Sequence, residues 1–287
     1  MGSSLVYALS LGEPYGFQFF RNGAFVALIA GGLCGLLGVF VVLRGMSYIG
    51  HGLSHAVFGG AAASAVMNFN YFIGAGIWGV VSGVLIGRIA RRRIIGADAA
   101  IGVVTTASFA LGLALLNRYG QAKRSIEAVL FGSVLGVKNS DIVAVLVVAV
   151  LATVIIVLGY RKFLFSTFDP EVAEVSGVKV SLMEAALMVM LSLTILVTMR
   201  VIGTLLISAL LVIPAATARL LTNRFSRMLW ISPLIGAASA FLGMNVAYHT
   251  NTSASAMIIL VGASAFTCVY FGSGVRGRRR MASFGHL

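Results

Sequence analysis

Two histidines, His51 and His55, lie four residues apart in an otherwise apolar stretch, GMSYIGHGLSHAVFGGAAASA, at 45–65. Residues four apart lie on one face of a helix, with Cβ atoms about 5–6 Å apart. Two neutral imidazoles in this geometry can bind one transition-metal ion, and ionisable residues in apolar segments are by default candidates for function. The alternative is that both rings only hydrogen-bond to neighbouring helices. We predict that both are metal ligands, with further ligands from elsewhere in the chain, a second copy of it, or water, since zinc usually takes three or four.

The composition is that of a protein that crosses a membrane several times. Of the 287 residues, 59% are hydrophobic and only 10% are charged, whereas a soluble domain has about 25% charged residues. The apolar run at 141–159 carries one charge, at its first residue, and about 20 apolar residues span a bilayer as a helix. The apolar runs are continuous rather than alternating, which excludes a transmembrane β-barrel. We therefore predict an all-α polytopic membrane protein.

Nine apolar segments are candidates for transmembrane helices. The segment at 46–67 could fall short of a full crossing, so we expect eight or nine spans. A piece at 125–137 is too short to span and is expected to be a re-entrant or interfacial helix. The prediction is a single transmembrane domain, 1–287, with an N-terminal segment at 1–20, a cytoplasmic loop at 161–181 and a basic cytoplasmic tail at 274–287. The nine segments are 22–43, 46–67, 71–90, 98–117, 140–160, 182–200, 201–220, 229–248 and 254–273.

The net charge of +13 comes from basic clusters between the apolar segments, at 88–93, 161–162, 219–227 and 276–280. Such clusters mark cytoplasmic loops, and nucleic acid is not expected as a partner, because the chain lacks a soluble basic face interleaved with aromatic residues. The C-terminus is then cytoplasmic, and the N-terminus is outside if all nine segments span. We expect a multi-pass protein of a prokaryotic plasma (inner) membrane, surrounded by lipid.

Four stretches, taken in order and spacing, resemble a known family of membrane proteins. They are LRGMSYIGHGLSHAVFGG at 43–60, STFDPEVAEVSGV at 166–178, VIGTLLISALLVIPAATARLL at 201–221 and AMIILVGASAF at 256–266. Together they are similar to the ABC-type manganese/zinc/iron permease family. The resemblance implies a membrane-spanning subunit of an ABC importer that moves a divalent metal into the cytoplasm. It also implies a homodimer, a dimer of cytoplasmic ABC ATPase subunits and an extracytoplasmic metal-binding protein.

The stretch at 166–178 is similar to the family's cytoplasmic F-D-P-E-x-A-x-x-x-G loop, which implies a short helix that couples the permease to its ATPase. The residues suit such a helix, because aspartate caps helix N-termini, proline is tolerated in the first turn and glycine ends helices. An ordinary surface helix is the alternative. The resemblance assigns coupling to Phe168, Asp169, Pro170, Glu171, Ala173 and Gly177.

The histidine motif departs from the family at one position. The family usually has an aspartate four residues before the motif histidine, and this pair holds its metal; the two positions are here His51 and His55. Imidazole suits zinc better than it suits the harder manganese, so we expect zinc first, then manganese or iron, as cargo and not as a permanent cofactor. The stretch at 249–257 also departs, and His249 is a weaker candidate for a ligand near the outer mouth of the pathway.

Two other functions compete with an ABC permease. A stand-alone ion-coupled secondary transporter or channel would explain the histidine pair but not the F-D-P-E loop. An intramembrane zinc enzyme would need a catalytic carboxylate beside the pair, and H-G-L-S-H has none. The chain contains no G-x-x-x-x-G-K-[ST] phosphate-binding loop, so we expect a transport subunit that is not itself an enzyme, with ATP hydrolysed on a partner chain.

Overall fold

The computed structural model describes residues 13–91, 95–119 and 136–284, and all regular structure in these ranges is helical. A 3-10 helix, η1 (Glu13–Gly16), precedes the α-helices. The α-helices are α2 (Gln18–Leu43), α3 (Ile49–Val66), α4 (Tyr71–Arg91), α5 (Ala97–Tyr119), α7 (Asn139–Leu158), α8 (Tyr160–Phe168), α9 (Pro170–Val175), α10 (Val180–Ile202), α11 (Thr204–Leu221), α12 (Phe225–Thr250) and α13 (Ala254–Phe284).

The predicted all-α polytopic fold is confirmed, and each of the nine predicted segments corresponds to one helix. Seven helices within the described residues are long and apolar enough to cross a membrane, namely α2, α4, α5, α7, α10, α12 and α13. Helix α3 is not among them, because two histidines and four glycines reduce its apolar content; in α11 the apolar stretch that the structure describes is Leu206–Leu221. Helix α13 continues to Phe284, so most of the predicted tail has a helical backbone. The predicted re-entrant piece, 125–137, lies almost entirely outside the described residues.

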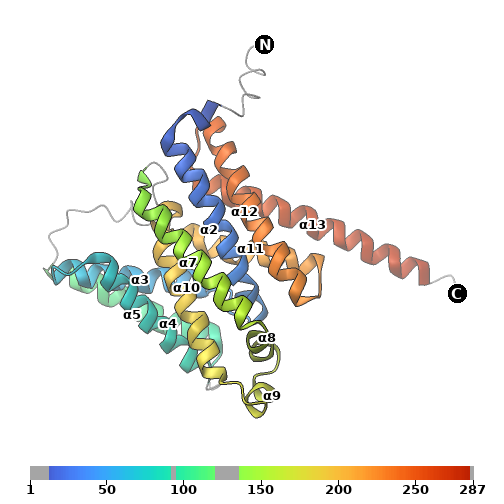
Figure 1. The fold of residues 1–287 in the computed structure, drawn as a ribbon, viewed down its shortest axis with the longest axis horizontal. Coiled ribbons are helices and arrows are strands. Elements are labelled where there is room, and N and C mark those ends of the chain that lie inside the picture. The colour runs from blue at the N-terminus through green and yellow to red at the C-terminus, as the bar shows by residue number, and fades with distance from the viewer. Residues whose placement is uncertain (1–12, 92–94, 120–135, 285–287) are drawn as a thin grey trace.

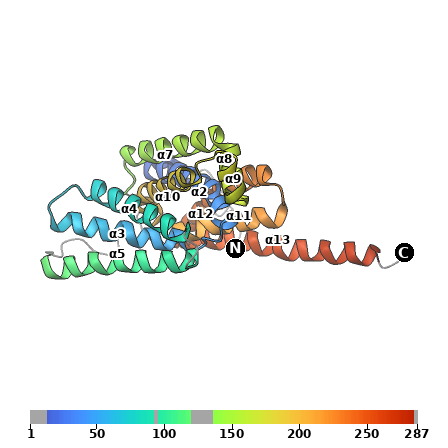
Figure 2. The ribbon, with the colours of Figure 1, turned by 90° about the horizontal axis from the view of Figure 1, so that it is seen from below.

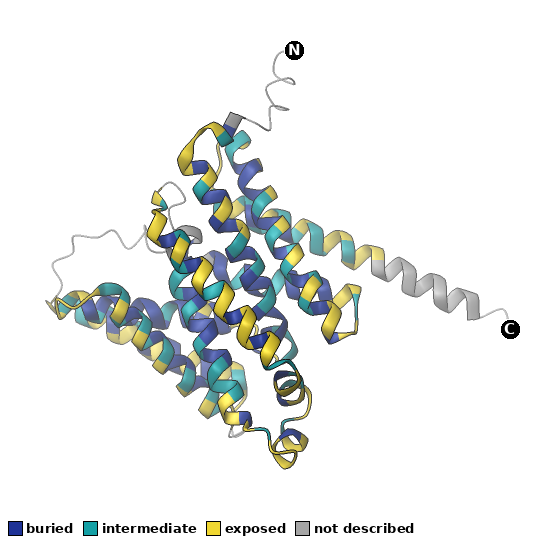
Figure 3. Ribbon diagram, in the orientation of Figure 1, coloured by how far each residue is buried: buried dark blue, intermediate teal, exposed yellow. Residues whose placement is uncertain are grey.

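Helix α2 forms the centre of the molecule. Helices α7, α10, α11 and α12 lie around it, while α3, α4 and α5 form a separate group inclined to it on one side, and α13 projects on the other (Figures 1 and 2). In the most apolar window of α2, 67% of residues are buried, against 17% in that of α7. Figure 3 shows the exposed residues of α7 along its whole length. An apolar helix this exposed is suited to contact with lipid.

Small residues allow the helices to approach closely. A Cβ atom on Gly31 of α2 would lie 2.4 Å from the carbonyl oxygen of Gly236 in α12, and Ser232 of α12 donates a hydrogen bond of 2.6 Å to the carbonyl of Gly35. In the second group, a Cβ on Gly59 of α3 would lie 2.3 Å from the carbonyl oxygen of Ser108 in α5. Such contacts drive helix association in lipid, where burial of apolar surface gives little net gain. The close approach of Gly59 to Ser108 holds α3 against α5.

Candidate metal site and cytoplasmic helix

The predicted ligands His51 and His55 converge at the start of α3. Their Nε2 atoms are 3.1 Å apart, and their rings lie edge to face with centroids 4.5 Å apart. Two nitrogens bound to one tetrahedral ion at about 2.0–2.1 Å would be separated by about 3.3 Å. The helix therefore holds the two rings near the separation that one bound ion requires.

The two histidines differ in how firmly they are held. The ring of His55 is partly buried and meets the edge of Phe109 in α5, with centroids 4.9 Å apart. Phe109 in turn packs against Phe58, at 5.4 Å. His51 is exposed on the protomer surface. Across the described residues, no group of three or more His, Cys, Asp or Glu side chains could hold a metal, so neither His249 nor any other such side chain joins the pair.

The helix predicted from the F-D-P-E loop is α9, and its ends are built as the sequence indicates. The Asp169 carboxylate accepts a hydrogen bond of 3.0 Å from the backbone N–H of Val172, and Pro170 is the first helical residue. At the other end, Gly177 has a φ of +81°, a conformation that glycine adopts without steric penalty. The N–H of Gly177 donates to Glu174 O and the N–H of Val178 donates to Ala173 O, the paired bonds of a Schellman C-terminus.

Apolar side chains are exposed on α9 and on the last residue of α8, next to its start. The exposed fractions are 58% for Phe168, 50% for Val172 and 91% for Val175, while Ala173 is fully buried against the protein. The Phe168 ring also contacts Phe225 of α12 edge to face, at 5.9 Å. The helix is thus anchored on its inner side and presents hydrophobic side chains outward.

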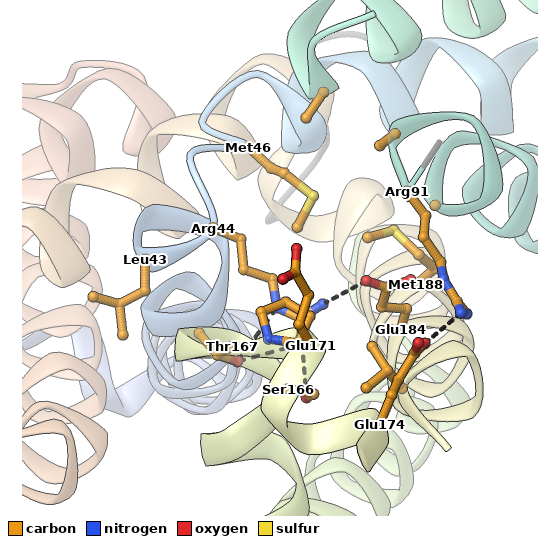
Figure 4. Close-up of a pocket in the computed structure, with 15 residues that line it drawn as sticks. Leu43, Arg44, Met46, Arg91, Ser166, Thr167, Glu171, Glu174, Glu184 and Met188 are labelled. Carbon is orange, nitrogen blue, oxygen red and sulfur yellow. Dashed lines mark hydrogen bonds and ion pairs between the residues drawn. The ribbon is translucent and has the colours of Figure 1, made fainter. Parts of the chain in front are cut away.

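A cavity of about 520 Å³ lies beside α9, between the ends of α2, α4, α8 and α10 (Figure 4). Two ion pairs cross it: Arg44 with Glu184, at 3.9 Å, and Arg91 with Glu174. The Arg44 and Glu184 side chains are only 10% and 20% exposed, whereas those of Arg91 and Glu174 are 40% and 49% exposed.

Arg44 makes the larger set of contacts. Its guanidinium donates to the hydroxyl of Ser166 at 3.1 Å and twice to that of Thr167 at 3.3 Å. Burial lowers the pKa of the Arg44 side chain and the Glu184 carboxylate raises it, and arginine stays charged in proteins. Sequence reasoning misses this cluster, although a charge directly after an apolar helix, as at Arg44, is a signal that could have drawn attention to it.

Comparison with known proteins identifies the class. The model of the ABC 3 transport family matches residues 16–273, and the chain belongs to this family, which confirms the resemblance of its motifs. It is 36% identical over 250 residues to "Manganese transport system membrane protein MntC" of Listeria monocytogenes, covering 87% of this chain and 89% of that protein. It is 34% identical over 266 residues to "Probable iron transport system membrane protein" of Haemophilus influenzae, covering 93% and 98%.

A solved structure, "PsaBC from Streptococcus pneumoniae in complex with Fab", matches with a TM-score of 0.77 and 35% identity, covering 88% of this chain and 91% of that one. The fold and the family together define a multi-pass permease of the bacterial plasma membrane.

Proposed function

We propose that this chain is the membrane-spanning subunit through which an ABC importer moves a divalent transition metal into the cytoplasm, and that His51 and His55 bind the metal on its way. The observation that carries the proposal is the Nε2–Nε2 separation of 3.1 Å, in a chain that resembles permeases named for manganese and iron transport. The same separation suits a hydrogen bond between two neutral rings, and the transport test below distinguishes that alternative from metal binding.

We propose manganese as the cargo. The sequence-based preference for zinc finds no support among the relatives, whose names give manganese and iron. Almost any nitrogen or oxygen site binds zinc more tightly than manganese, so tight zinc binding by the pair would not by itself identify zinc as cargo. On this proposal zinc competes at the site, and the supply of metal determines what is carried.

The partial ligand set supports a homodimer. His51 is exposed, and the described part of one protomer offers no third ligand beside the pair. A second copy that faces this surface would bring two more imidazoles to the same place, and an extracytoplasmic metal-binding protein would deliver the ion. Two pairs would supply four imidazoles, and water could complete the octahedral coordination that manganese prefers.

The capped helix α9 supports docking of ABC ATPase subunits on the cytoplasmic side. Phe168 and Val172 expose hydrophobic surface, which in a soluble environment marks a site of protein association. Asp169, Pro170, Glu171 and Gly177 define the start and end of the helix, and Ala173 fits it against the protein.

The test is metal transport into proteoliposomes by the permease reconstituted with and without its ATPase subunits. We expect ATP-dependent uptake of Mn²⁺ that is abolished by His55→Ala, because the variant loses the more firmly held ligand while its helix is preserved. His249→Ala is the matched control and should transport at the parent rate. Uptake that proceeds without the ATPase would instead favour a secondary transporter, and normal uptake by a well-folded His55→Ala variant would remove the pair from the pathway.

A further inference from the structure

Arg44 joins three elements at the cytoplasmic cavity. It is the first residue after α2, its guanidinium donates to Ser166 and Thr167 at the end of α8, and it pairs with Glu184 of α10. Figure 4 shows these groups converging on the guanidinium beneath Met46.

On one side, Arg44 is directly connected to the start of α9. Ser166 and Thr167 precede Phe168 and Asp169, and Asp169 is the residue that caps α9. A displacement of α9 therefore either moves the two hydroxyls together with Arg44 or breaks their hydrogen bonds.

On its other side, Arg44 is directly connected to the helix that carries the histidines. Gly45, with a φ of +67°, turns the chain out of α2: its N–H donates to Val42 O, and the N–H of Met46 donates to Val41 O. This closed turn sets the direction in which the chain leaves Arg44. Met46 is only 5% exposed, and His51 follows in the first turn of α3.

The burial of Arg44 makes this connection stiff. A guanidinium that is 10% exposed cannot exchange its partners for water without a large penalty, since buried charges need partners, and charge-assisted hydrogen bonds are the stronger ones. The second link from α9, between Arg91 and Glu174, is half exposed, and pairs of that kind contribute little. A push on α9 should reach the core through Arg44 rather than through Arg91.

We propose that Arg44 is a positioning residue that transmits movement of α9 to the α2–α3 junction and so to the histidine pair. The proposal rests on the proposed function, because it takes α9 as the ATPase-docking helix and the pair as the metal site. It predicts that loss of the Arg44 contacts separates ATP hydrolysis from metal movement without altering the metal site itself.

The experiment measures two quantities in the permease–ATPase complex in proteoliposomes: Mn²⁺ transported per ATP hydrolysed, and the Mn²⁺ concentration at half-maximal transport. For Arg44→Gln we expect the number of Mn²⁺ ions transported per ATP to fall about 10-fold, while the half-maximal Mn²⁺ concentration stays within about 2-fold. A general loss of structure would change both quantities. The parent complex must itself transport Mn²⁺ with ATP. Absence of transport by the parent complex contradicts the proposed function, whereas normal coupling in the Arg44 variants contradicts the role of Arg44.

Arg91→Gln is the matched control, because it removes an arginine that also contacts α9 but is half exposed. It should keep the parent ratio. Thr167→Val removes a hydroxyl that accepts from Arg44 without exposing a buried charge, and it should lower the ratio in the same direction. Should Arg44→Gln fail to assemble, the double variant Arg44→Met with Glu184→Gln removes both charges of the pair, a replacement that buried ion pairs often tolerate, and it should be uncoupled.

The proposal is overturned if assembled Arg44 variants keep the parent transport ratio, or if Arg91→Gln lowers that ratio as strongly as they do. It is equally overturned if the Arg44 variants change the half-maximal Mn²⁺ concentration as strongly as the transport ratio.

Discussion

The exposed ring of His51 is where a substitution should change selectivity most cleanly. His55 is fixed by Phe109, whereas His51 has an open side that can accommodate a smaller ligand. The resemblance of the motif implies aspartate at the position of His51.

Replacing His51 with aspartate should raise the ratio of manganese to zinc transport. Carboxylate oxygen suits manganese and imidazole suits zinc, and we expect a change on the order of 10-fold, or about 1.4 kcal/mol of relative affinity. Uptake of both metals, measured side by side in proteoliposomes, checks the prediction. His51→Asn is a control of similar size that offers a neutral carbonyl oxygen, and it should favour manganese less than His51→Asp does. If the ratio is unchanged in a folded His51→Asp variant, His51 is not a ligand.

At the scale of single residues, the sequence predicts those contacts that depend only on local spacing along a helix. Positions four apart on a helix bring His51 and His55 together whatever the rest of the fold. The contact between His55 and Phe109 could not be predicted, because it depends on how α3 packs against α5, and the sequence does not show which helix Gly52 and Gly59 face.

At the scale of elements, α9 is short, so its caps carry much of its stability. Asp169→Ala removes the hydrogen bond to the Val172 N–H, and loss of such a cap costs about 1 kcal/mol. We expect metal-dependent ATPase activity of the reconstituted complex to fall several-fold, while the half-maximal Mn²⁺ concentration is unchanged.

The matched control for this prediction is Asp169→Asn. Asparagine caps helices about as well as aspartate, so this variant should keep most of the activity. Equal activity of the alanine and asparagine variants would show that the order of α9 does not limit coupling.

Both ends of α9 could be predicted from the sequence, because caps involve residues within a few positions of each other. The Arg44 cluster could not, since its members come from α2, α8 and α10 and are far apart in the chain. The sequence shows that Arg44 and Glu184 flank apolar segments, but not that they meet.

At the scale of the whole molecule, the central position of α2 depends on its close contact with α12. Gly31→Ala would place a Cβ atom 2.4 Å from a backbone oxygen of α12, and we expect it to lower the free energy of unfolding by about 1–3 kcal/mol, as overpacked cores do. Thermal unfolding in detergent measures the effect.

The next residue of α2 provides the control for this prediction. A Cβ on Gly32 would meet its nearest neighbour, the Ala237 Cβ, at 3.8 Å, an ordinary contact. Since alanine favours helix by about 1 kcal/mol over glycine, Gly32→Ala should be neutral or stabilising. Equal destabilisation by the two variants would mean that α2 and α12 do not approach as closely as described.

The class of fold could be predicted because hydrophobic length alone determines it, and each of the nine segments became a helix. The arrangement of the helices could not, since apolar residues face lipid and protein alike in a membrane and the sequence does not separate the two. Close glycine contacts mark the surfaces that face protein. The sequence alone, however, does not show that Gly31 lies much closer to α12 than Gly32 does.

The low apolar content of α3 has a consequence for how the chain is made. A segment that carries two histidines and four glycines, and that falls short of the other spans in hydrophobicity, should partition poorly from the translocation channel into lipid alone. Insertion of α3 would then depend on α4 and α5, because close contacts with these two helices would stabilise α3 in the membrane where transfer into lipid alone does not. In nascent chains released after residue 70, we expect reporter sites beyond α3 to remain on the cytoplasmic side, and in chains that include α5 we expect α3 to be inserted. Efficient insertion of α3 without its neighbours would show that the segment with the histidine pair has no such dependence during synthesis.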